Sequence, residues 1–550
     1  MEELYKELFE EIEKRKLNDV KSVLKLSREL CRKYRPNTFP SIIQILTNAN
    51  EDQFKKLKFL ITKPMRTKSG VTPIALMTKP TKCPHGQCIM CGGGVDSFYG
   101  DVPQSYTGTE PSTMRGIRNN YDSYLMTFNR LEQFILLNQS VDKVEIIIQG
   151  GTFTAMDIEY QDEFILFAFK AMNDFSEEFF ENDVLNLNKF KEFFELPTDV
   201  LDKERTKRIQ ERVLKLKGSS SLEKEHERNE VSKVRCVGLT IETRPDWGML
   251  KEGNKMLEQG CTRVELGLQT TSDEVLEKIK RGHTVKDIKD SMRILKDLGF
   301  KINGHVMIGL PGQKDGELIE FFDDEDFRPD MLKIYPCMVM PGTELEVMFK
   351  KGEFKPLTTE ESVKIISDFK VKVPKYVRIM RVQRDIPTKE TVAGVDKTNL
   401  RQIVDKYMKD KNLKCNCIRC NEVKSEIKNP VLDVIEYEAS NGKEYFIYFK
   451  QENEIIGFCR LRFPSEFLRE EFIEGSAIIR ELHVYGKAVD VSKKGDVQHK
   501  GFGRKLMGKA EEICKENSKK KLLVISGVGV REYYKKLGYE KDGPYVSKML

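Results

Sequence analysis

The chain has 550 residues, of which 39% are hydrophobic, and its 93 Lys and Arg exceed its 87 Asp and Glu by only six charges. This length predicts three or four domains and excludes a small disulfide-stapled fold, while the composition excludes global disorder. The first segment is charged and amphipathic rather than a signal peptide, and no apolar run could span a bilayer, so we expect a cytoplasmic protein.

Residues 1–71 are predicted to form a small, basic, helical unit. Apolar residues recur at helical spacing, as at Leu4, Leu8 and Ile12. Residues 25–80 hold 12 Lys and Arg against 3 Asp and Glu. Segregated positive charge favours a polyanionic partner such as RNA. On charge alone, a solvated basic face is an equally good interpretation.

Residues 72–360 are predicted to form a parallel array of strands and helices. Six short apolar runs alternate with helical stretches: TPIALM, VEIIIQG, CVGLTIET, RVELGLQ, KINGHVMIG and LKIYP. This alternation is typical of parallel strands joined by crossover helices, so we expect an α/β fold with a partial (β/α)6 barrel. A charged helical insertion at about 173–232 interrupts the array and is expected to be a mobile surface excursion.

A cysteine loop follows the first of these runs. Cys83, Cys88 and Cys91 lie in the sequence CPHGQCIMC. In a cytoplasmic protein, clustered cysteines indicate a metal rather than disulfides. Three thiolates are what a [4Fe-4S] cluster needs when one iron stays open to a ligand, and we favour this interpretation. A zinc site with His85 as fourth ligand is the alternative.

Glycine and polar residues mark the carboxyl ends of later strands. Gly150 and Gly151 in GGTF follow the second strand, where glycines let a ligand approach the backbone. Glu242, Gln269 and Tyr335 occupy the corresponding places in TIETRPD, ELGLQT and KIYP. Barrel enzymes collect their active sites at this face. Singly each residue would be an ordinary strand-end hydrogen-bonder; together with the cysteines they predict a cofactor site.

Residues 361–429 are predicted to be a basic linker with a second cysteine group. Residues 371–419 hold 13 Lys and Arg against 5 Asp and Glu. Cysteines so close together in KCNCIRCNE favour a structural zinc ion over free thiols. The predicted ligands are Cys415, Cys417 and Cys420, with His483 as the best candidate for the fourth.

Residues 430–550 are predicted to form a separate α+β domain. Four strand-like runs precede the glycine turn QHKGFG, the helix GRKLMGKAEE and a last strand, VISGVGV. Backbone N–H groups at the turn and the helix start can hold a pyrophosphate. A lone G-x-G would indicate only a tight turn, but the whole order resembles the Gcn5-related acetyltransferase fold.

These motifs in their order resemble one known family. The cysteine loop, QSYTGTEPSTMR, GGTF, TIETRPD, GCTRVELGLQ, RGHT and KIYP are similar to the radical S-adenosylmethionine half of the catalytic third subunit of Elongator. Residues 430–550 resemble its acetyltransferase half, in the archaeal form. Two departures are the four-residue gap between Cys83 and Cys88, where three residues are usual, and Met90 in place of an aromatic residue. Neither removes a thiolate.

The resemblance implies cofactors and site residues. The first cysteines would hold the [4Fe-4S] cluster, with Gly150 and Gly151 beside the methionyl amine of S-adenosylmethionine. Acetyl-CoA would lie along Glu481–Val484 and over Phe502–Arg504, with Lys143 reaching towards it. The other candidates are Glu242 and Gln269 at the rim; Glu481, Leu482, His483 and Val484 on the strand; Gln498, Gly501, Phe502, Gly503 and Arg504 at the turn; and Tyr534, Tyr533, Lys333 and Tyr335 for catalysis.

The resemblance also implies a reaction on tRNA. A 5′-deoxyadenosyl radical would abstract hydrogen from the acetyl methyl of acetyl-CoA, and the carbon radical would add to C5 of the wobble uridine. Thioester hydrolysis would then leave carboxymethyluridine. The basic stretches would bind the anticodon stem-loop, with the target base splayed out. The electron donor and any companion subunits are left open.

Two other classes of function are compatible with the sequence. A protein lysine acetyltransferase with a structural iron-sulfur domain would need no S-adenosylmethionine. A tRNA-binding scaffold would carry neither cluster nor acetyl-CoA turnover. The intact cysteine and glycine motifs favour the modification enzyme.

Overall fold

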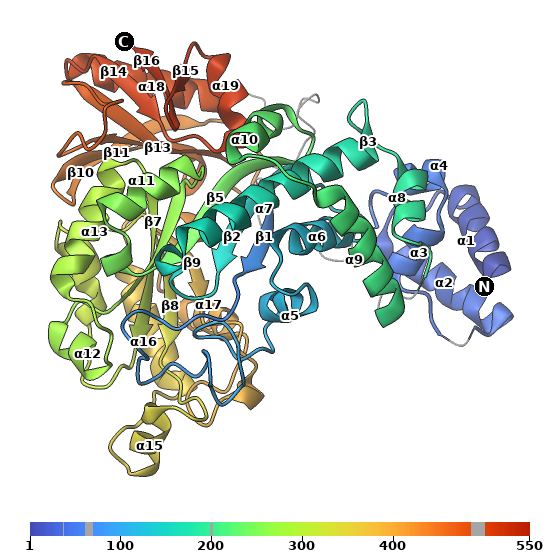
Figure 1. Cartoon of the computed structure of the whole chain (residues 1–550), viewed down its shortest axis with the longest axis horizontal. Coiled ribbons are helices and arrows are strands. Elements are labelled where there is room, and N and C mark those ends of the chain that lie inside the picture. Colours follow the sequence, from blue (N-terminus) through green and yellow to red (C-terminus); the bar gives the residue numbers. More distant parts are fainter. Residues whose placement is uncertain (37, 61–69, 199–201, 486–500) are drawn as a thin grey trace.

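The computed structural model describes residues 1–36, 38–60, 70–198, 202–485 and 501–550. Figure 1 shows the N-terminal helices in blue at one end of the molecule, a helix-covered parallel sheet in the middle, and a second sheet in orange and red. Within the described ranges, no helix is both long and apolar enough to cross a bilayer.

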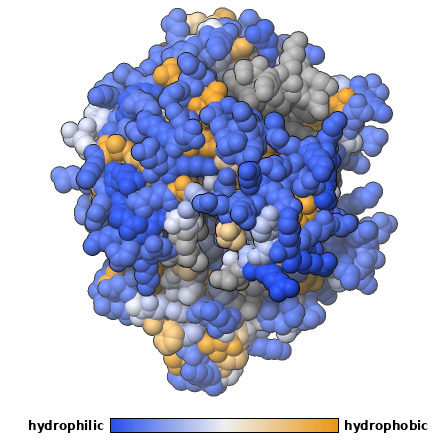
Figure 2. Space-filling view, turned by 90° about the vertical axis from the view of Figure 1, so that its right-hand side faces the viewer, coloured by the Kyte–Doolittle hydropathy of each residue, from blue (hydrophilic) through white to orange (hydrophobic). Residues whose placement is uncertain are grey.

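The N-terminal unit is helical, as predicted, and has a core of its own. Leu4, Leu8 and Ile12 lie in that core, and Ser41 begins α3 with a capping box that pairs it with Gln44. Figure 2 looks onto this end of the molecule, and its surface is mostly hydrophilic. The helices are α1 (Glu2–Lys14), α2 (Val20–Tyr34), α3 (Ile42–Asn48) and α4 (Glu51–Lys56).

Seven parallel strands form the central sheet in the order β1-β2-β5-β6-β7-β8-β9. All six predicted strands are present, and β9 adds a seventh from the stretch predicted as a linker. In the described part of the chain the edge strands β1 and β9 do not pair, so the sheet is a partial barrel. The strands are β1 (Thr72–Met77), β2 (Lys143–Gln149), β5 (Arg235–Thr243), β6 (Arg263–Gln269), β7 (Lys301–Ile308), β8 (Met331–Pro336) and β9 (Arg378–Val382).

Helices connect consecutive strands and cover the outside of this sheet. The sheet follows chain order because each strand returns beside its predecessor through a crossover. Capping boxes at Thr284 and Thr358 begin two of the helices. The helices are α5 (Pro111–Arg118), α6 (Ser123–Leu136), α7 (Ile158–Phe179), α11 (Leu250–Glu258), α12 (Asp273–Lys278), α13 (Val285–Asp297), α14 (Glu320–Asp323), α15 (Glu344–Lys350), α16 (Thr359–Lys372) and α17 (Leu400–Asp410).

The insertion at 173–232 packs into the core, contrary to the surface excursion that we expected. Phe175, Phe179, Phe190 and Phe194 are buried and stack in a continuous aromatic cluster. Most of the charges that suggested a solvated segment lie on the outside, whereas Arg205, Glu225 and Glu230 are buried with it. The elements are β3 (Phe180–Glu181), β4 (Val184–Leu185), α8 (Leu187–Phe193), α9 (Lys203–Lys217) and α10 (Leu222–Val231).

The second sheet has the order β10-β11-β12-β13-β14-β16-β15, in which only β13 and β14 run parallel. The prediction of a last strand at VISGVGV, residues 524–530, was wrong. β14 ends at Val524, and two further strands follow. The elements are β10 (Val431–Ala439), β11 (Gly442–Gln451), β12 (Glu454–Phe463), β13 (Ser476–Val484), α18 (Phe502–Glu516), β14 (Lys521–Val524), α19 (Arg531–Lys535), β15 (Glu540–Asp542) and β16 (Tyr545–Met549).

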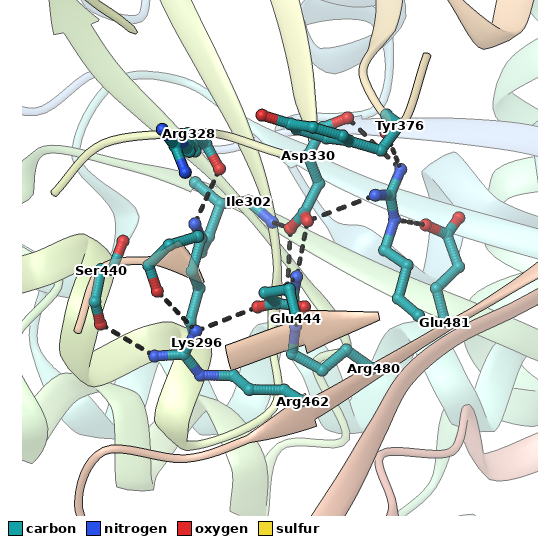
Figure 3. Close-up of polar contacts among 12 residues, drawn as sticks. Lys296, Ile302, Arg328, Asp330, Tyr376, Ser440, Glu444, Arg462, Arg480 and Glu481 are labelled. Atoms are coloured by element: carbon teal, nitrogen blue, oxygen red, sulfur yellow. Dashed lines mark hydrogen bonds and ion pairs between the residues drawn. The ribbon is translucent and has the colours of Figure 1, made fainter. Parts of the chain in front are cut away.

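Buried charges join the two sheets (Figure 3). Arg480 of β13 makes two hydrogen bonds to Asp330, which directly precedes β8. Arg462 of β12 pairs with Asp297 at the end of α13, at 2.7 Å, and with Glu444 of β11, at 3.0 Å. All five side chains are almost completely buried. The second sheet is therefore held to the barrel by directional contacts.

Candidate active site

The three cysteines of the first loop lie in the segment that follows β1. Cys88 and Cys91 are buried and Cys83 is half-buried. Burial raises the pKa of the Cys83 and Cys91 thiols, a cost that binding of their thiolates to iron offsets. Polar neighbours lie close to each thiol: Thr152 Oγ1 at 3.8 Å from Cys83, His85 Nε2 at 3.2 Å from Cys88, and Gln104 Nε2 and Ser105 Oγ each at 3.0 Å from Cys91.

The spacing of these sulfurs fits a cluster better than a single ion. Tetrahedral zinc, with Zn–S bonds of about 2.3 Å, brings its ligand sulfurs within roughly 4 Å of one another. The sulfurs of Cys83, Cys88 and Cys91 do not all lie within 4.8 Å of one another. A [4Fe-4S] cube holds its cysteines further apart because each binds a different iron. The donor set therefore fits the cluster.

Gly150 and Gly151 follow β2 in a conformation that only glycine adopts easily. Their φ angles are +131° and +106°. A Cβ atom on Gly150 would lie 2.1 Å from Thr78 Oγ1, and one on Gly151 would lie 3.0 Å from Gln104 Cβ. The Thr78 hydroxyl is buried and has no hydrogen-bond partner among the described residues. The bare backbone and this orphaned hydroxyl fit a ligand with polar groups, such as the methionyl end of S-adenosylmethionine.

Glu242 and Gln269 end their strands at the same rim. Glu242 receives long hydrogen bonds of 3.4 Å from Tyr106 and from Gln149. Gln269 has a φ of +71°, where the pairing of β6 with β7 shifts register. Sequence reasoning did not single out Tyr106 or Gln149, although Tyr106 lies within QSYTGTEPSTMR.

Arg281 of the RGHT motif is a further rim residue without a predicted role. Its guanidinium lies over Gly267, where a Cβ would be 2.3 Å from Nη2, and Nη1 lies 3.6 Å from Cys88 Sγ. The buried Nε has no partner among the described residues. RGHT and ELGLQ thus meet the cysteine loop, which explains why these motifs accompany it.

Lys333 and Tyr335 face the barrel interior from β8 and are both buried. Lys333 forms an ion pair with Glu265 of β6, and its Nζ lies 3.8 Å from Glu242. Tyr335 packs edge-on against His305 of β7, with ring centroids 5.6 Å apart. Glu265 and His305 were not predicted. They lie in the middle of β6 and β7, whereas the recognisable sequence motifs lie at the ends of strands.

The strand predicted to bind acetyl-CoA, β13, is no longer paired with β14 at the segment where the ligand would bind. β13 pairs with β14 from Ser476 to Ile479, and no β14 pairing continues to Glu481–Val484. That segment still pairs with β12 on its other side. Within the described residues, its β14-side backbone groups are thus available to a ligand that adds as an extended chain. The segment contains the predicted residues Glu481, Leu482, His483 and Val484.

The glycine turn and helix lie next to this opening. Gly501 is the N-cap of α18, with a φ of +79°, and no described side chain caps the helix, so within the described residues its first N–H groups can bind a phosphate. Arg504 is exposed, whereas Tyr534 is buried. A Cβ on Gly503 would lie 2.7 Å from the Tyr533 hydroxyl, so Phe502, Gly503 and Tyr533 adjoin. Gln498 lies outside the described residues.

Lys143 begins β2 at the end of the barrel opposite the cysteine loop. It pairs with Arg235 of β5, and a Cβ on Gly529 of the second sheet's domain would lie 2.6 Å from Arg235 Cβ. Burial lowers the pKa of Lys143. The predicted lysine is therefore placed close to the junction of the two domains.

The second cysteine group forms a compact trio. The sulfurs of Cys415, Cys417 and Cys420 lie within 4.8 Å of one another. Hydrogen bonds from its two neighbours hold the pKa of Cys417 well below its usual range. His483 does not join them, contrary to the predicted fourth ligand. Its ring lies between Phe458 and Tyr485 in the second sheet.

Family comparisons agree with the two-part site. The sequence matches the Radical SAM superfamily over residues 77–324 and the Radical_SAM C-terminal domain over residues 329–410. It matches the Acetyltransferase (GNAT) family over residues 416–539 and the ELP3 N-terminal domain over residues 1–68.

Curated relatives extend over nearly the whole chain. The tRNA uridine(34) acetyltransferase of Methanocaldococcus jannaschii is 45% identical, over 99% of this chain and 96% of its own. Human Elongator complex protein 3 is 38% identical, over 96% of this chain and 93% of its own. The solved structure of Methanocaldococcus infernus Elp3 with an N-terminal deletion superposes with a TM-score of 0.71 at 40% identity, covering 88% of this chain and 100% of that one.

Proposed function

The chain belongs to the family of tRNA uridine(34) acetyltransferases and Elongator complex protein 3, and from this premise we propose that it modifies the wobble uridine of tRNA. The product would be carboxymethyluridine, formed from the acetyl group of acetyl-CoA. One observation carries the proposal: the cysteine loop and the opened strand β13 lie at opposite ends of one barrel, which has a polar interior.

The cysteine-loop end binds the radical cofactors in this proposal. Cys83, Cys88 and Cys91 hold the [4Fe-4S] cluster, and Gly150 and Gly151 give S-adenosylmethionine access to bare backbone. When bound, these groups supply a deoxyadenosyl radical. Because Tyr106, Gln149 and Glu242 line the rim beside them, the protein orients the ligand with fixed hydrogen-bonding groups.

The opposite end binds acetyl-CoA. The free start of α18 and Arg504 hold its pyrophosphate, and the opened edge of β13 holds its extended arm. The acetyl group then points into the barrel, towards Lys333 and Tyr335. Their burial excludes water from a reactive carbon radical.

A basic stripe on α2 supports tRNA binding by the N-terminal unit. Four exposed cations are spaced so that they share one helix face. None of them has an ion pair with a described residue, whereas nearby Lys33 is paired with Glu7. Such a stripe suits phosphates along one strand of an RNA stem. The stripe consists of Lys21, Lys25, Arg28 and Arg32.

Two finer assignments belong to the proposal. Cys415, Cys417 and Cys420 would bind a structural zinc ion, since three thiols within 4.8 Å suit tetrahedral coordination. The protein would act in the cytoplasm, where reduced cysteines persist and tRNA is found.

Anaerobic reconstitution with iron and sulfide tests the whole proposal. The protein receives dithionite, S-adenosylmethionine, acetyl-CoA and unmodified tRNA, and the digested nucleosides are identified by mass spectrometry. We expect carboxymethyluridine that depends on both small molecules, and its loss in Cys83→Ala, Cys88→Ala and Cys91→Ala. Cys31→Ala, at an isolated cysteine outside the barrel, is the matched control. Acetylated protein formed without S-adenosylmethionine would instead identify a lysine acetyltransferase.

A further inference from the structure

His305 and Glu265 form a hydrogen-bonded pair in the middle of the barrel. His305 Nε2 lies 2.8 Å from a Glu265 carboxylate oxygen. Glu265 is only 1% exposed and also accepts a hydrogen bond of 3.0 Å from Asn303. The carboxylate is therefore held by two side chains of the neighbouring strand β7, and it orients the imidazole in turn.

This pair is not a metal site, although its geometry permits one. Glu242, Glu265 and His305 offer three ligand atoms within 4.8 Å of one another. The Lys333 ammonium already forms an ion pair with Glu265 and lies 3.8 Å from Glu242. A bound divalent cation would have to share this space with an ammonium ion, which electrostatic repulsion disfavours.

The pair lies between the two cofactor ends. Lys301, at the start of β7, interacts electrostatically with Glu481 of the opened strand. His305 is four residues further along β7, roughly 13 Å from that level at about 3.3 Å per residue. The carboxyl end of β7, at Ile308, is another three residues on, or roughly 10 Å. The His305 imidazole is thus placed between the start of β7, next to Glu481, and its carboxyl end at the rim.

The imidazole has one nitrogen free for chemistry. Nε2 is engaged with Glu265, while Nδ1 has no hydrogen bond within the described part of the chain. The His305 side chain retains 17% exposure although it lies inside the barrel. A carboxylate that holds one nitrogen sets the tautomer and leaves the other nitrogen to accept a proton, as in hydrolytic triads.

We propose that His305 is the general base that hydrolyses the CoA thioester on the modified uridine, and that Glu265 is its positioning residue. This inference rests on the proposed function. Nδ1 accepts a proton from water as the water oxygen bonds to the thioester carbonyl carbon. The carbon–sulfur bond then breaks, and the proton passes from the imidazolium to the leaving CoA sulfur. The products are CoA thiol and a carboxyl group, which ionises to the carboxylate.

His305→Asn tests this role, with Glu265→Gln as the second variant. In the complete reaction we expect His305→Asn to form deoxyadenosine at the wild-type rate but to retain CoA on tRNA as a thioester. Hydroxylamine should cleave this thioester and release the CoA. Carboxymethyluridine should fall at least 100-fold. Glu265→Gln should show the same adduct with a smaller loss. Acetyl-CoA affinity, measured by calorimetry on the reconstituted protein, should not change.

The outcomes separate this inference from the proposed function. Wild-type carboxymethyluridine formation by His305→Asn would overturn the role of His305. Deoxyadenosine without any uridine adduct would also overturn it, because the block would then precede hydrolysis. If His305→Asn melts below the assay temperature, Glu265→Gln decides by the same readouts. Failure of the wild-type protein to form any uridine product would instead refute the proposed function itself.

Discussion

Arg480 and Asp330 meet in two parallel hydrogen bonds, with Nη1–Oδ2 at 2.8 Å and Nη2–Oδ1 at 2.6 Å, and both side chains are completely enclosed. Arg480 directly precedes the opened segment of β13, and Asp330 precedes Lys333 by three residues. The pair thus fixes the acetyl-CoA strand relative to the strand that carries the channel residues.

Asp330→Asn should destabilise the protein strongly, because the buried Arg480 guanidinium then keeps only Glu444 as a charged partner among the described residues. We expect a loss of about 3–5 kcal/mol in the free energy of unfolding, measured by denaturant titration. Asp330→Leu combined with Arg480→Met should recover most of that loss. Lys314→Gln, on an exposed turn, is the control. An unchanged stability in Asp330→Asn would contradict the structure at this interface.

Lys296 predicts a pH dependence of stability. Its Nζ is buried and donates to the carbonyls of Phe327 and Arg328, and burial lowers its pKa from 10.5 to about 7. Between these values the unfolded chain binds the extra proton, so the free energy of unfolding should rise with pH from about 7 to 10.5. Lys296→Met should flatten this slope relative to the wild type in unfolding titrations. Equal slopes would show that Lys296 has its usual pKa.

Gly150→Ala should abolish S-adenosylmethionine cleavage. The new methyl group would overlap the Thr78 hydroxyl at 2.1 Å and would occupy a left-handed backbone conformation. Gly508→Ala is the matched control, since it lies on α18 with no atom within 4 Å and should stabilise the helix slightly. Deoxyadenosine formation and thermal melting are measured for both. Full activity in Gly150→Ala would remove this glycine from the cofactor site.

The α2 stripe should control tRNA affinity and its salt dependence. Replacing Lys25, Arg28 and Arg32 together by Gln should weaken binding. Each lost phosphate contact should reduce the slope of log affinity against log salt by about one unit. Filter binding or anisotropy at several salt concentrations measures this. Lys33→Gln, whose lysine is already paired with Glu7, should change the slope less. An unchanged slope in the triple variant would place the RNA elsewhere.

Cys417→Ser should abolish zinc binding by the second cysteine group, which we propose as a zinc site. Elemental analysis of the purified protein should find about one zinc per chain in the wild type and little in the variant. Cys459→Ser, at an isolated buried cysteine of the second sheet, should keep the zinc. Zinc retained in Cys417→Ser would exclude this residue as a ligand.

Features defined by spacing along the chain could be predicted from the sequence, whereas features that depend on contacts between distant segments could not. Six strands and the cysteine, glycine and strand-end motifs could be recognised because spacing along the chain defines them. β9 was missed because two of the five residues of its run, RIMRV, are charged, and only its pairing with β8 makes it a strand. The insertion was misjudged because its phenylalanines are scattered among charges.

His305 and Glu265 were hidden for a related reason. They occupy mid-strand positions, and their proximity depends on the register between β6 and β7, which places Glu265 opposite Asn303. A histidine within GHVMIG carries no motif by itself. The interface arginines were equally invisible, since the spacing of Arg460 and Arg462 on β12 is that of an ordinary solvated strand face.

The glycine contacts at the domain junction bear on whether the halves could be exchanged. Gly527 and Gly529 lie against the backbone of β5 so closely that any larger side chain would collide with it. Together with the buried arginines Arg462 and Arg480, they fit the two domains to each other, so that each domain alone would expose groups that the other now covers. A chimaera that joins this barrel to an acetyltransferase from elsewhere would expose unpaired carboxylates and lose the fit.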